Sequence, residues 1–301
     1  MARAYATLLT KEAYLAGVLV LAQGLRAVQS RYPLVVMVTP GLSAAARTVL
    51  AKRGIAVRDI EGLYPAVAKH TLADARFEET WTKLRVFELG EYTRLVLLDA
   101  DMAVVKNMDD LFDMHLPADE IAAAHACACN PRKIPHYPKD WVPANCAFTA
   151  LKHPLDKPVT PTEGPRPYSL LNSGTVVLNP SRRLAESIYE FLATTPRLAE
   201  FKFPDQDLLA AFFHGRWRPL PWYYNALRTL RTVHPNAWRD DTVRCVHYIL
   251  TGKPWEEPRP KGESDADLLE RWWWGYYDAV AKELKERDPE GYKLVARYVV
   301  G

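Results

Sequence analysis

The chain has 301 residues, of which 49% are hydrophobic and 25% are charged. This is the composition of an ordinary soluble globular protein, and the chain is long enough to bury a large core. The net charge of +3 comes without any basic block, so neither a nucleic-acid surface nor binding to an anionic membrane is expected.

No segment has the character of a membrane span. The longest apolar run, residues 13–22, is shorter than the roughly 20 residues that a bilayer-spanning helix needs. A strand-like segment begins within a few residues of Met1, which leaves no room for a signal peptide. We therefore expect a cytoplasmic protein.

Four cysteines agree with that compartment. Cys127 and Cys129 form a C-x-C pair, whereas Cys146 and Cys245 stand alone. A C-x-C pair without a second C-x-x-C or His pair is a weak zinc signal. Small buried thiols are favoured over a metal site or a disulfide.

The first third of the chain alternates strands and helices. Such alternation predicts a mostly parallel central sheet with helices on both sides, and ligands bind beyond the carboxyl ends of its strands. The predicted strands are 4–9, 34–39, 55–60 and 94–99, and the predicted helices are 11–30, a helix capped by Ser43 that runs to about Arg53, and one near 82–92.

The rest of the chain is less regular. Nine prolines fall between residues 130 and 168, and a loop of that kind is either a binding lid or a rigid surface excursion. We expect one domain over 1–301, with 130–168 as the candidate acceptor lid and 265–301 as a C-terminal helical extension. The other predicted elements are a strand at 170–180, a helix from Ser181, a short helix at 205–213 and a strand at 242–249.

Two acids one residue apart, Asp99 and Asp101, end a continuous apolar strand. Like charges this close raise each other's pKa unless a cation compensates them. A divalent ion would do so, and His247, at the end of another predicted strand, would add a nitrogen ligand that suits Mn²⁺ better than Ca²⁺. Six residues on, Lys253 could neutralise a phosphate.

Here the sequence resembles a known family, the family 8 retaining glycosyltransferases, which include glycogenin and the galactinol synthases. The resemblance covers nearly the whole chain, in the order and spacing of several blocks. It implies a Rossmann-like GT-A fold, a UDP-sugar donor, Mn²⁺ with Mg²⁺ as a substitute, and retention of the anomeric configuration. The blocks are "ATLLTKEAYLAGVLVLAQGL", "YPLVVMVTPGLS", "WTKLRVFELGEY", "LLDADMAVVKNMDDLFD", "LLNSGTVVLNPS", "FPDQDLLAAFF", "PWYYNAL" and "VRCVHYILTGKPW".

The resemblance gives roles to single positions. Asp99, Asp101 and His247 would bind the metal ion, while Asp205 and Gln206 would lie beneath the reacting carbon as catalytic residues. The remaining positions would contact the donor: Leu8, Leu9, Thr10 and Tyr14 at the uridine, Lys83 at the donor sugar nucleotide, Ala100 at the ribose, Asn172 and Ser173 at the sugar, and Lys253, with Gly252 before it, at the departing β-phosphate.

Each position also has a plainer interpretation. Asp205 could simply serve as the cap of the helix after Pro204, Tyr14 could be a core residue, and Lys83 could be a solvated surface charge. The aromatic stretch 271–280 is expected to pack on the sheet rather than to stack on sugars.

Departures from the family pattern point to a subgroup. Lys11 stands where an Asn is usual, and Leu250 stands where glycogenin has a Gly. Seven residues past Asn225, where glycogenin carries the tyrosine that it glucosylates, this chain has Thr232. The stretch "RTVHPNAW", the C-x-C pair and the loop "PHYPKDW" resemble the galactinol synthases, which transfer galactose to myo-inositol.

We therefore expect a hexosyltransferase that passes galactose or glucose from a UDP-sugar to a separate acceptor, a small polyol or saccharide. A self-glucosylating glycogenin-like enzyme, a non-catalytic nucleotide-sugar-binding module and, least favoured, a haloacid-dehalogenase-type phosphohydrolase are the alternatives. Front-face attack and a covalent intermediate on Asp205 both stay open, as does a homodimer.

Overall fold

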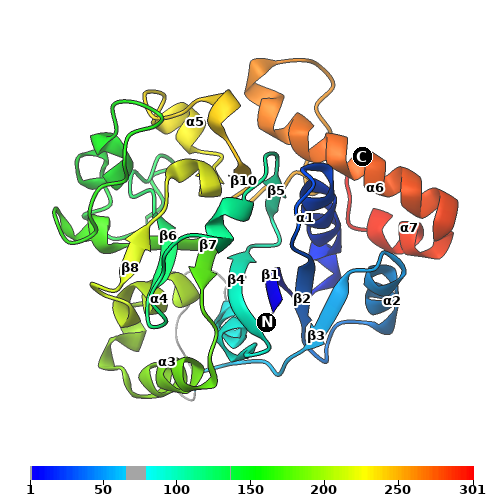
Figure 1. Cartoon of the computed structure of the whole chain (residues 1–301). Coiled ribbons are helices and arrows are strands. Elements are labelled where there is room, and N and C mark those ends of the chain that lie inside the picture. Colours follow the sequence, from blue (N-terminus) through cyan, green and yellow to red (C-terminus); the bar gives the residue numbers. More distant parts are fainter. Residues whose placement is uncertain (1, 66–78, 136) are drawn as a thin grey trace.

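A computed structural model of the chain describes residues 2–65, 79–135 and 137–301. A seven-stranded sheet crosses the molecule, from β8 at the left of Figure 1 to β3 at the right. Its strand order is β3-β2-β1-β4-β7-β6-β8. The strands are β1 (Ala2–Leu9), β2 (Leu34–Val38), β3 (Ala56–Asp59), β4 (Tyr92–Leu98), β6 (Ile121–His125), β7 (Leu171–Leu178) and β8 (Trp217–Pro219).

The sheet is mostly parallel, as predicted. β1 pairs in parallel with β2 and β4, and β2 with β3. β7 runs antiparallel between β4 and β6, and β8 is again parallel to β6. β2 and residues Leu95 to Leu98 of β4 are buried throughout, which agrees with strands covered on both faces.

Helices cover both faces of this sheet (Figure 1). α6 packs on α1, and α7 packs on α2 at the same side of the molecule, while α3 contacts α4. The helices are α1 (Leu15–Ala27), α2 (Ala44–Lys52), α3 (Arg182–Thr194), α4 (Pro204–Phe212), α5 (Leu230–Val233), α6 (Leu268–Arg287) and α7 (Pro289–Ala296).

Helix ends follow the sequence signals. The Ser43 hydroxyl accepts a hydrogen bond from the backbone N–H of Ala46 at 3.1 Å, which confirms the predicted cap of α2. Ser181 caps α3 in the same way through Leu184. The helix predicted near 82–92 is instead a 3₁₀ helix, Thr80–Glu88. Further 3₁₀ turns span Glu12–Tyr14, Asp109–Phe112, Pro143–Asn145, Ala147–Ala150, Arg166–Ser169, Pro196–Glu200, Trp222–Asn225, Asp240–Thr242 and Asp265–Asp267.

A second, small sheet lies beside the carboxyl end of β4. Its strands are β5 (Met102–Val104), β10 (Cys245–His247) and β9 (Ala226–Leu227), in the order β5-β10-β9. The strand predicted at 242–249 is therefore only three residues long, because a 3₁₀ turn precedes it and the backbone turns at Leu250, whose φ is +71°. The antiparallel pairing of β10 with β5 sets His247 opposite Met102.

The C-terminal aromatic stretch is part of the core. Trp273 is fully buried and stacks on Tyr277 with ring centroids 5.2 Å apart. This confirms that the aromatic face of the stretch packs inside the protein, and the helix that carries it, α6, packs mainly against α1.

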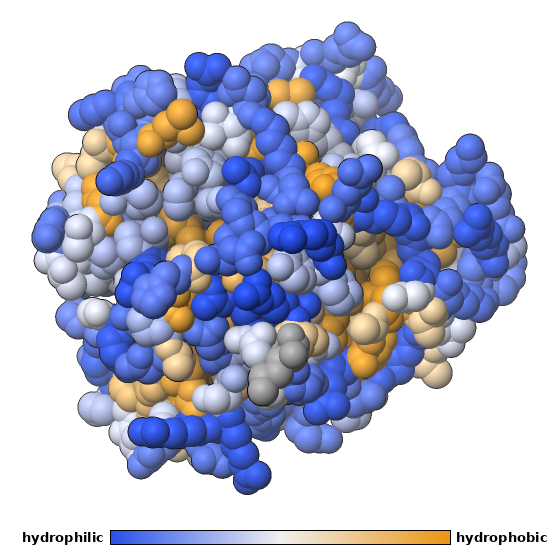
Figure 2. Space-filling view, in the orientation of Figure 1, coloured by the Kyte–Doolittle hydropathy of each residue, from blue (hydrophilic) through white to orange (hydrophobic). Residues whose placement is uncertain are grey.

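The outer surface is mostly hydrophilic on the face seen in Figure 2, where apolar residues are scattered. In the three described ranges, no helix is long and apolar enough to cross a membrane.

Candidate active site

A cavity of about 610 Å³ lies beyond the carboxyl ends of β1 and β4. Its volume is typical of small-molecule sites, and its position is where open α/β sheets bind ligands. Thirteen of the positions singled out from the sequence line it: Leu8, Thr10, Tyr14, Lys83, Asp99, Ala100, Asp101, Asn172, Ser173, Asp205, Gln206, His247 and Lys253. Leu9 instead lies in the core, fully buried, and Gly252 takes a positive φ of +72° and accepts a hydrogen bond from Arg228 through its carbonyl.

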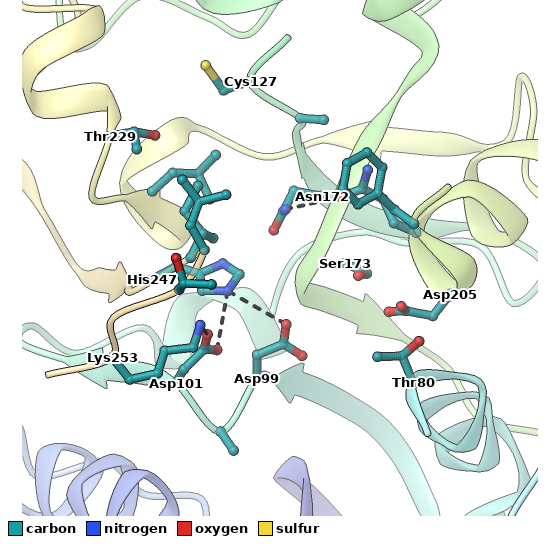
Figure 3. Close-up of a pocket in the computed structure, with 18 of the residues that line it drawn as sticks. Thr80, Asp99, Asp101, Cys127, Asn172, Ser173, Asp205, Thr229, His247 and Lys253 are labelled. Atoms are coloured by element: carbon teal, nitrogen blue, oxygen red, sulfur yellow. Dashed lines mark hydrogen bonds and ion pairs between the residues drawn. The ribbon is translucent and has the colours of Figure 1, made fainter. Parts of the chain in front are cut away.

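The acids and the histidine meet at one point in the cavity (Figure 3). His247 Nε2 lies 3.3 Å from Asp101 Oδ1 and 3.7 Å from Asp99 Oδ2. The small sheet creates this contact, because β10 pairs with the strand that follows Asp101, and the N–H of Tyr248 donates to the Asp101 carbonyl. We call Asp99, Asp101 and His247 the acidic cluster.

A neighbouring amide orients the imidazole. His247 Nδ1 lies 2.9 Å from Asn225 Oδ1, an oxygen that can only accept, so Nδ1 carries the proton. Nε2 faces the carboxylates of Asp99 and Asp101. Two carboxylates and an imidazole that converge on one point are a ligand set for a divalent cation, so the residues fit a metal ion.

Two buried lysines compensate the acids from opposite sides. Lys253 pairs with Asp101 and also donates to the carbonyl of Tyr248 at 2.8 Å. Lys83 Nζ lies 2.8 Å from Asp99 Oδ1 and 2.6 Å from Asp205 Oδ2. The prediction that Lys83 is more than a solvated surface charge is therefore consistent with its position.

These contacts shift the pKa values in different directions. Burial raises the pKa of Asp99, although Lys83 and His247 oppose the shift. Burial also acts on Asp101, but Lys253 and His247 outweigh it and lower the pKa of that carboxyl. Burial lowers the pKa of Lys83, and Asp205 and Asp99 more than reverse this, so its pKa is raised. Lys83 and Asp101 are thus held in their charged forms.

Asp205 lies in the first turn of α4 but does not cap the helix. Asp207, two residues on, instead accepts through Oδ2 the backbone N–H groups of Lys202 at 2.7 Å and Phe203 at 2.9 Å, just before the helix begins. Asp205 is only 4% exposed and its carboxylate faces Lys83 in the cavity. Its position therefore argues against the helix-cap interpretation.

A chain of amide hydrogen bonds connects the two ends of the site. Asn225 Nδ2 donates to Asn172 Oδ1 at 2.8 Å, and Asn172 Nδ2 donates to Gln206 Oε1 at 3.1 Å. Sequence reasoning did not single out Asn225, although its place in "YYNAL" before a small strand was a signal. The chain runs from the acidic cluster to α4 and fixes both.

The glycine of "NSG" is required by close packing. A Cβ on Gly174 would lie 2.3 Å from His247 Cε1, so no other residue fits there without moving the imidazole. The Gly174 carbonyl also accepts the N–H of Asp99. One position of β7 thus holds two members of the acidic cluster in place.

The proline-rich segment, 130–168, forms one wall of the cavity. Arg132 and Ile134 line it, and so does an aromatic trio of Tyr137, Trp141 and Phe203. In the trio, the Trp141 and Phe203 rings stack with centroids 5.2 Å apart, and Tyr137 meets both edge-on. Among the other basic residues of this segment, Lys133 and Lys139 are exposed, and His136 lies outside the described residues.

The glycogenin-type acceptor position lies elsewhere. Thr232 is an exposed residue of α5, and it lines a second surface hollow beside Trp238. It is Thr229, one turn earlier, that lines the main cavity.

Comparisons with known proteins agree with this architecture. A family model described as glycosyl transferase family 8 matches residues 6–258. Galactinol synthase 7 of Arabidopsis thaliana is 34% identical over 297 residues, which cover 95% of this chain and 85% of that protein. Galactinol synthase 1 of Ajuga reptans is 31% identical over 281 residues, covering 91% and 80%.

Solved structures show the same fold. The galactosyltransferase LgtC, in complex with donor and acceptor sugar analogs, superposes with a TM-score of 0.60 at 16% identity, covering 94% of this chain and 99% of that one. The glycosyltransferase GlyE of Streptococcus pneumoniae TIGR4 gives 0.59 at 16% identity, covering 94% and 64%. These structures confirm the expected GT-A architecture, and the sequence matches show that the chain belongs to glycosyl transferase family 8 and is similar to its galactinol synthases.

Proposed function

We propose that the chain is a Mn²⁺-dependent retaining transferase that moves a hexose, galactose or glucose, from a UDP-sugar to a hydroxyl of a separate small polyol such as myo-inositol. The observation that carries the proposal is the acidic cluster at one end of a cavity whose other end holds the Lys83–Asp205 ion pair. The names of the curated relatives support galactose and a polyol as the substrates.

The metal ion would be held by Asp99, Asp101 and His247, whose mixed carboxylate and imidazole ligands suit Mn²⁺, with Mg²⁺ as a weaker substitute. When bound, it supplies Lewis-acid stabilisation of the diphosphate leaving group. Lys253, whose ammonium group pairs with Asp101, would hold the departing β-phosphate.

The donor would occupy the β1 side of the cavity. We assign Leu8, Thr10 and Tyr14 to the uridine and the backbone at Ala100 to the ribose, and we assign Asn172 and Ser173 to the sugar. Leu9 would support this wall from the core, and Gly252 would set the turn that presents Lys253.

Asp205 and Gln206 would act at the reacting carbon. As the UDP departs, positive charge develops on the sugar ring, and the buried Asp205 carboxylate stabilises that charge. Gln206, held by Asn172, orients the sugar. We favour attack on the face that UDP leaves, with a phosphate oxygen taking the acceptor proton; a glycosyl ester on Asp205 is the alternative route to retention.

The acceptor would lie between the donor and segment 130–168, which we propose as its lid. The aromatic trio offers flat apolar surfaces of the kind that pack against sugar or polyol faces, and Arg132 offers hydrogen-bond donors for hydroxyl groups. The position of Thr232, exposed and outside the main cavity, supports a separate acceptor over a self-glucosylated tyrosine.

The test is a UDP-release assay with UDP-galactose and UDP-glucose, with and without Mn²⁺ and myo-inositol. The proposal expects slow metal-dependent hydrolysis and a clear rise when the polyol is added. A non-catalytic module would bind UDP without releasing it from the sugar, and a ladder of added hexoses in the intact-protein mass would restore the glycogenin-like alternative.

A further inference from the structure

Three cysteines and a histidine converge on one point outside the acidic cluster. Cys127 and Cys129 follow β6, Cys146 lies between the 3₁₀ turns Pro143–Asn145 and Ala147–Ala150, and His234 ends α5. We call these four residues the thiol cluster. Cys129, Cys146 and His234 are buried, and Cys127 is half-buried. The sequence pattern favours small buried thiols, because the C-x-C pair has no second ligand pair nearby in the sequence.

Their distances resemble those of a tetrahedral metal site. His234 Nε2 lies 3.6 Å from Cys127 Sγ, 3.1 Å from Cys129 Sγ and 3.6 Å from Cys146 Sγ. All four ligand atoms lie within 4.8 Å of one another. With Zn–S at about 2.3 Å and Zn–N at about 2.0 Å, tetrahedral geometry sets sulfur and nitrogen ligands about 3.5 Å apart. One small ion at the centre therefore reaches all four atoms.

The ligand types select the metal. Thiolates are soft ligands that favour Zn²⁺, whereas the carboxylates of the acidic cluster are hard ligands that suit Mn²⁺. Three cysteines and one histidine leave no coordination position for water or substrate, which is the arrangement of a structural site. All four cysteines are free of disulfides, so the three in the cluster are available as ligands.

The site would join segments that have little regular structure of their own. Cys127 and His234 are 107 residues apart in sequence, and Cys146 belongs to the proline-rich segment. Cys127 also lines the main cavity, at its edge near Thr229, with its sulfur directed away from the acids (Figure 3). A crosslink here would fix the start of segment 130–168 against α5.

We propose that Cys127, Cys129, Cys146 and His234 bind one structural Zn²⁺ ion that anchors the acceptor side of the cavity. The ion is separate from the metal of the acidic cluster and takes no part in bond making. Its presence does not depend on which sugar is transferred or whether the chain is catalytic at all.

The experiment measures metal in the full chain, purified without a polyhistidine tag, by inductively coupled plasma mass spectrometry. We expect about one zinc per chain. Cys129→Ser and Cys146→Ser should lose the zinc, whereas Cys245→Ser, which removes a buried cysteine of β10 outside the cluster, should keep it. Asp101→Ala should also keep its zinc, since it alters only the acidic cluster.

A second measurement covers the case in which the serine variants do not fold. Wild-type protein expressed with Co²⁺ in place of zinc should show thiolate-to-cobalt charge transfer and intense visible bands of a tetrahedral site, and X-ray absorption should give three sulfur ligands and one nitrogen ligand. Wild-type protein that holds no metal, that holds iron, that forms a disulfide among the three cysteines, or that loses its zinc in Asp101→Ala but not in Cys129→Ser would overturn the proposal.

Discussion

The acidic cluster and the thiol cluster each bring their ligand atoms within 4.8 Å, yet the surrounding structure treats them differently. Asp99 and Asp101 line the open cavity and are compensated by Lys83 and Lys253. The thiol cluster consists of three thiols and one imidazole and has four ligands. The first arrangement leaves room for exchangeable ligands around a hard cation, and the second encloses a soft one.

The contrast indicates that one chain can keep the site of its reaction apart from a site that only stabilises its loops. The acidic cluster lies at the ends of strands in two sheets, where the backbone is fixed by regular pairing. The thiol cluster joins loops and short turns, which lack such pairing. We infer that the parallel-sheet half positions the donor by its own fold, whereas the proline-rich half needs a crosslink to position the acceptor.

The largest expected effect on turnover comes from a change in the acidic cluster alone. Asp101→Ala removes a ligand and the partner of Lys253, so Mn²⁺-dependent turnover should fall by at least about 10²-fold. The far-ultraviolet circular dichroism should be unchanged. Asp113→Ala, at an exposed surface pair with Arg3, is the matched control and should keep its rate. Undiminished turnover in Asp101→Ala would remove the acidic cluster from the mechanism.

The next effect tests the far end of the cavity. Asp205→Asn keeps the size of the side chain but removes the charge that would face the reacting carbon, so kcat should fall by roughly 10²-fold. UDP affinity should change little in a calorimetric titration. Asp207→Asn, two residues on in the same turn, should keep kcat, because its oxygen can still accept the two backbone N–H groups. An Asp205→Asn variant that loses UDP affinity but not rate would place this residue in the donor pocket.

A smaller effect is expected from the residue that orients the imidazole. Asn225→Ala removes the hydrogen bond to His247 Nδ1, and losses of this kind weaken metal affinity by about 10- to 100-fold. The Mn²⁺ concentration for half-maximal turnover should rise accordingly, while the rate at saturating Mn²⁺ recovers toward wild type. Asn179→Ala, which alters an amide bound to Leu116 and Pro117, serves as the control. Equal Mn²⁺ dependence in both variants would show that Asn225 does not position the ligand.

The last prediction concerns Asp207→Asn, which should keep its turnover and alter only how the free energy of unfolding depends on pH. Burial raises the pKa of Asp207 to about 6, above the value of about 3.9 in an unfolded chain. The folded state therefore binds this proton more tightly, so the stabilisation is complete below pH 4 and is lost as pH rises through 6. The loss is on the order of 3 kcal/mol. Urea titrations should show Asp207→Asn with a flatter dependence over that window; an identical slope in wild type and variant would contradict the shift.

Much of the fold could be predicted from the sequence, because regular elements carry their signal locally. The four strands of the first third and the caps Ser43 and Ser181 follow from periodicity and side-chain chemistry. The meeting of Asp99 and Asp101 with His247 was expected from the family resemblance, and the structure brings them together.

The parts that could not be predicted depend on contacts between distant residues. β5 and β10 have three residues each and β9 has two, too few for a periodic pattern, yet they align His247 with the acids. Asn225 acts only through residues that lie near it in the folded structure and far from it in the sequence. The C-x-C pair is only a weak signal by itself, and its meeting with His234 depends on a separation of 107 residues between Cys127 and His234.

The proposed reaction can be tested by proton NMR of the product formed from an α-linked UDP-hexose, Mn²⁺ and myo-inositol. The product should be a hexosyl-polyol whose new anomeric proton shows α configuration, and it should be absent in Asp101→Ala. A β-linked product, free hexose alone, or hexose attached to the protein itself would contradict the proposed function.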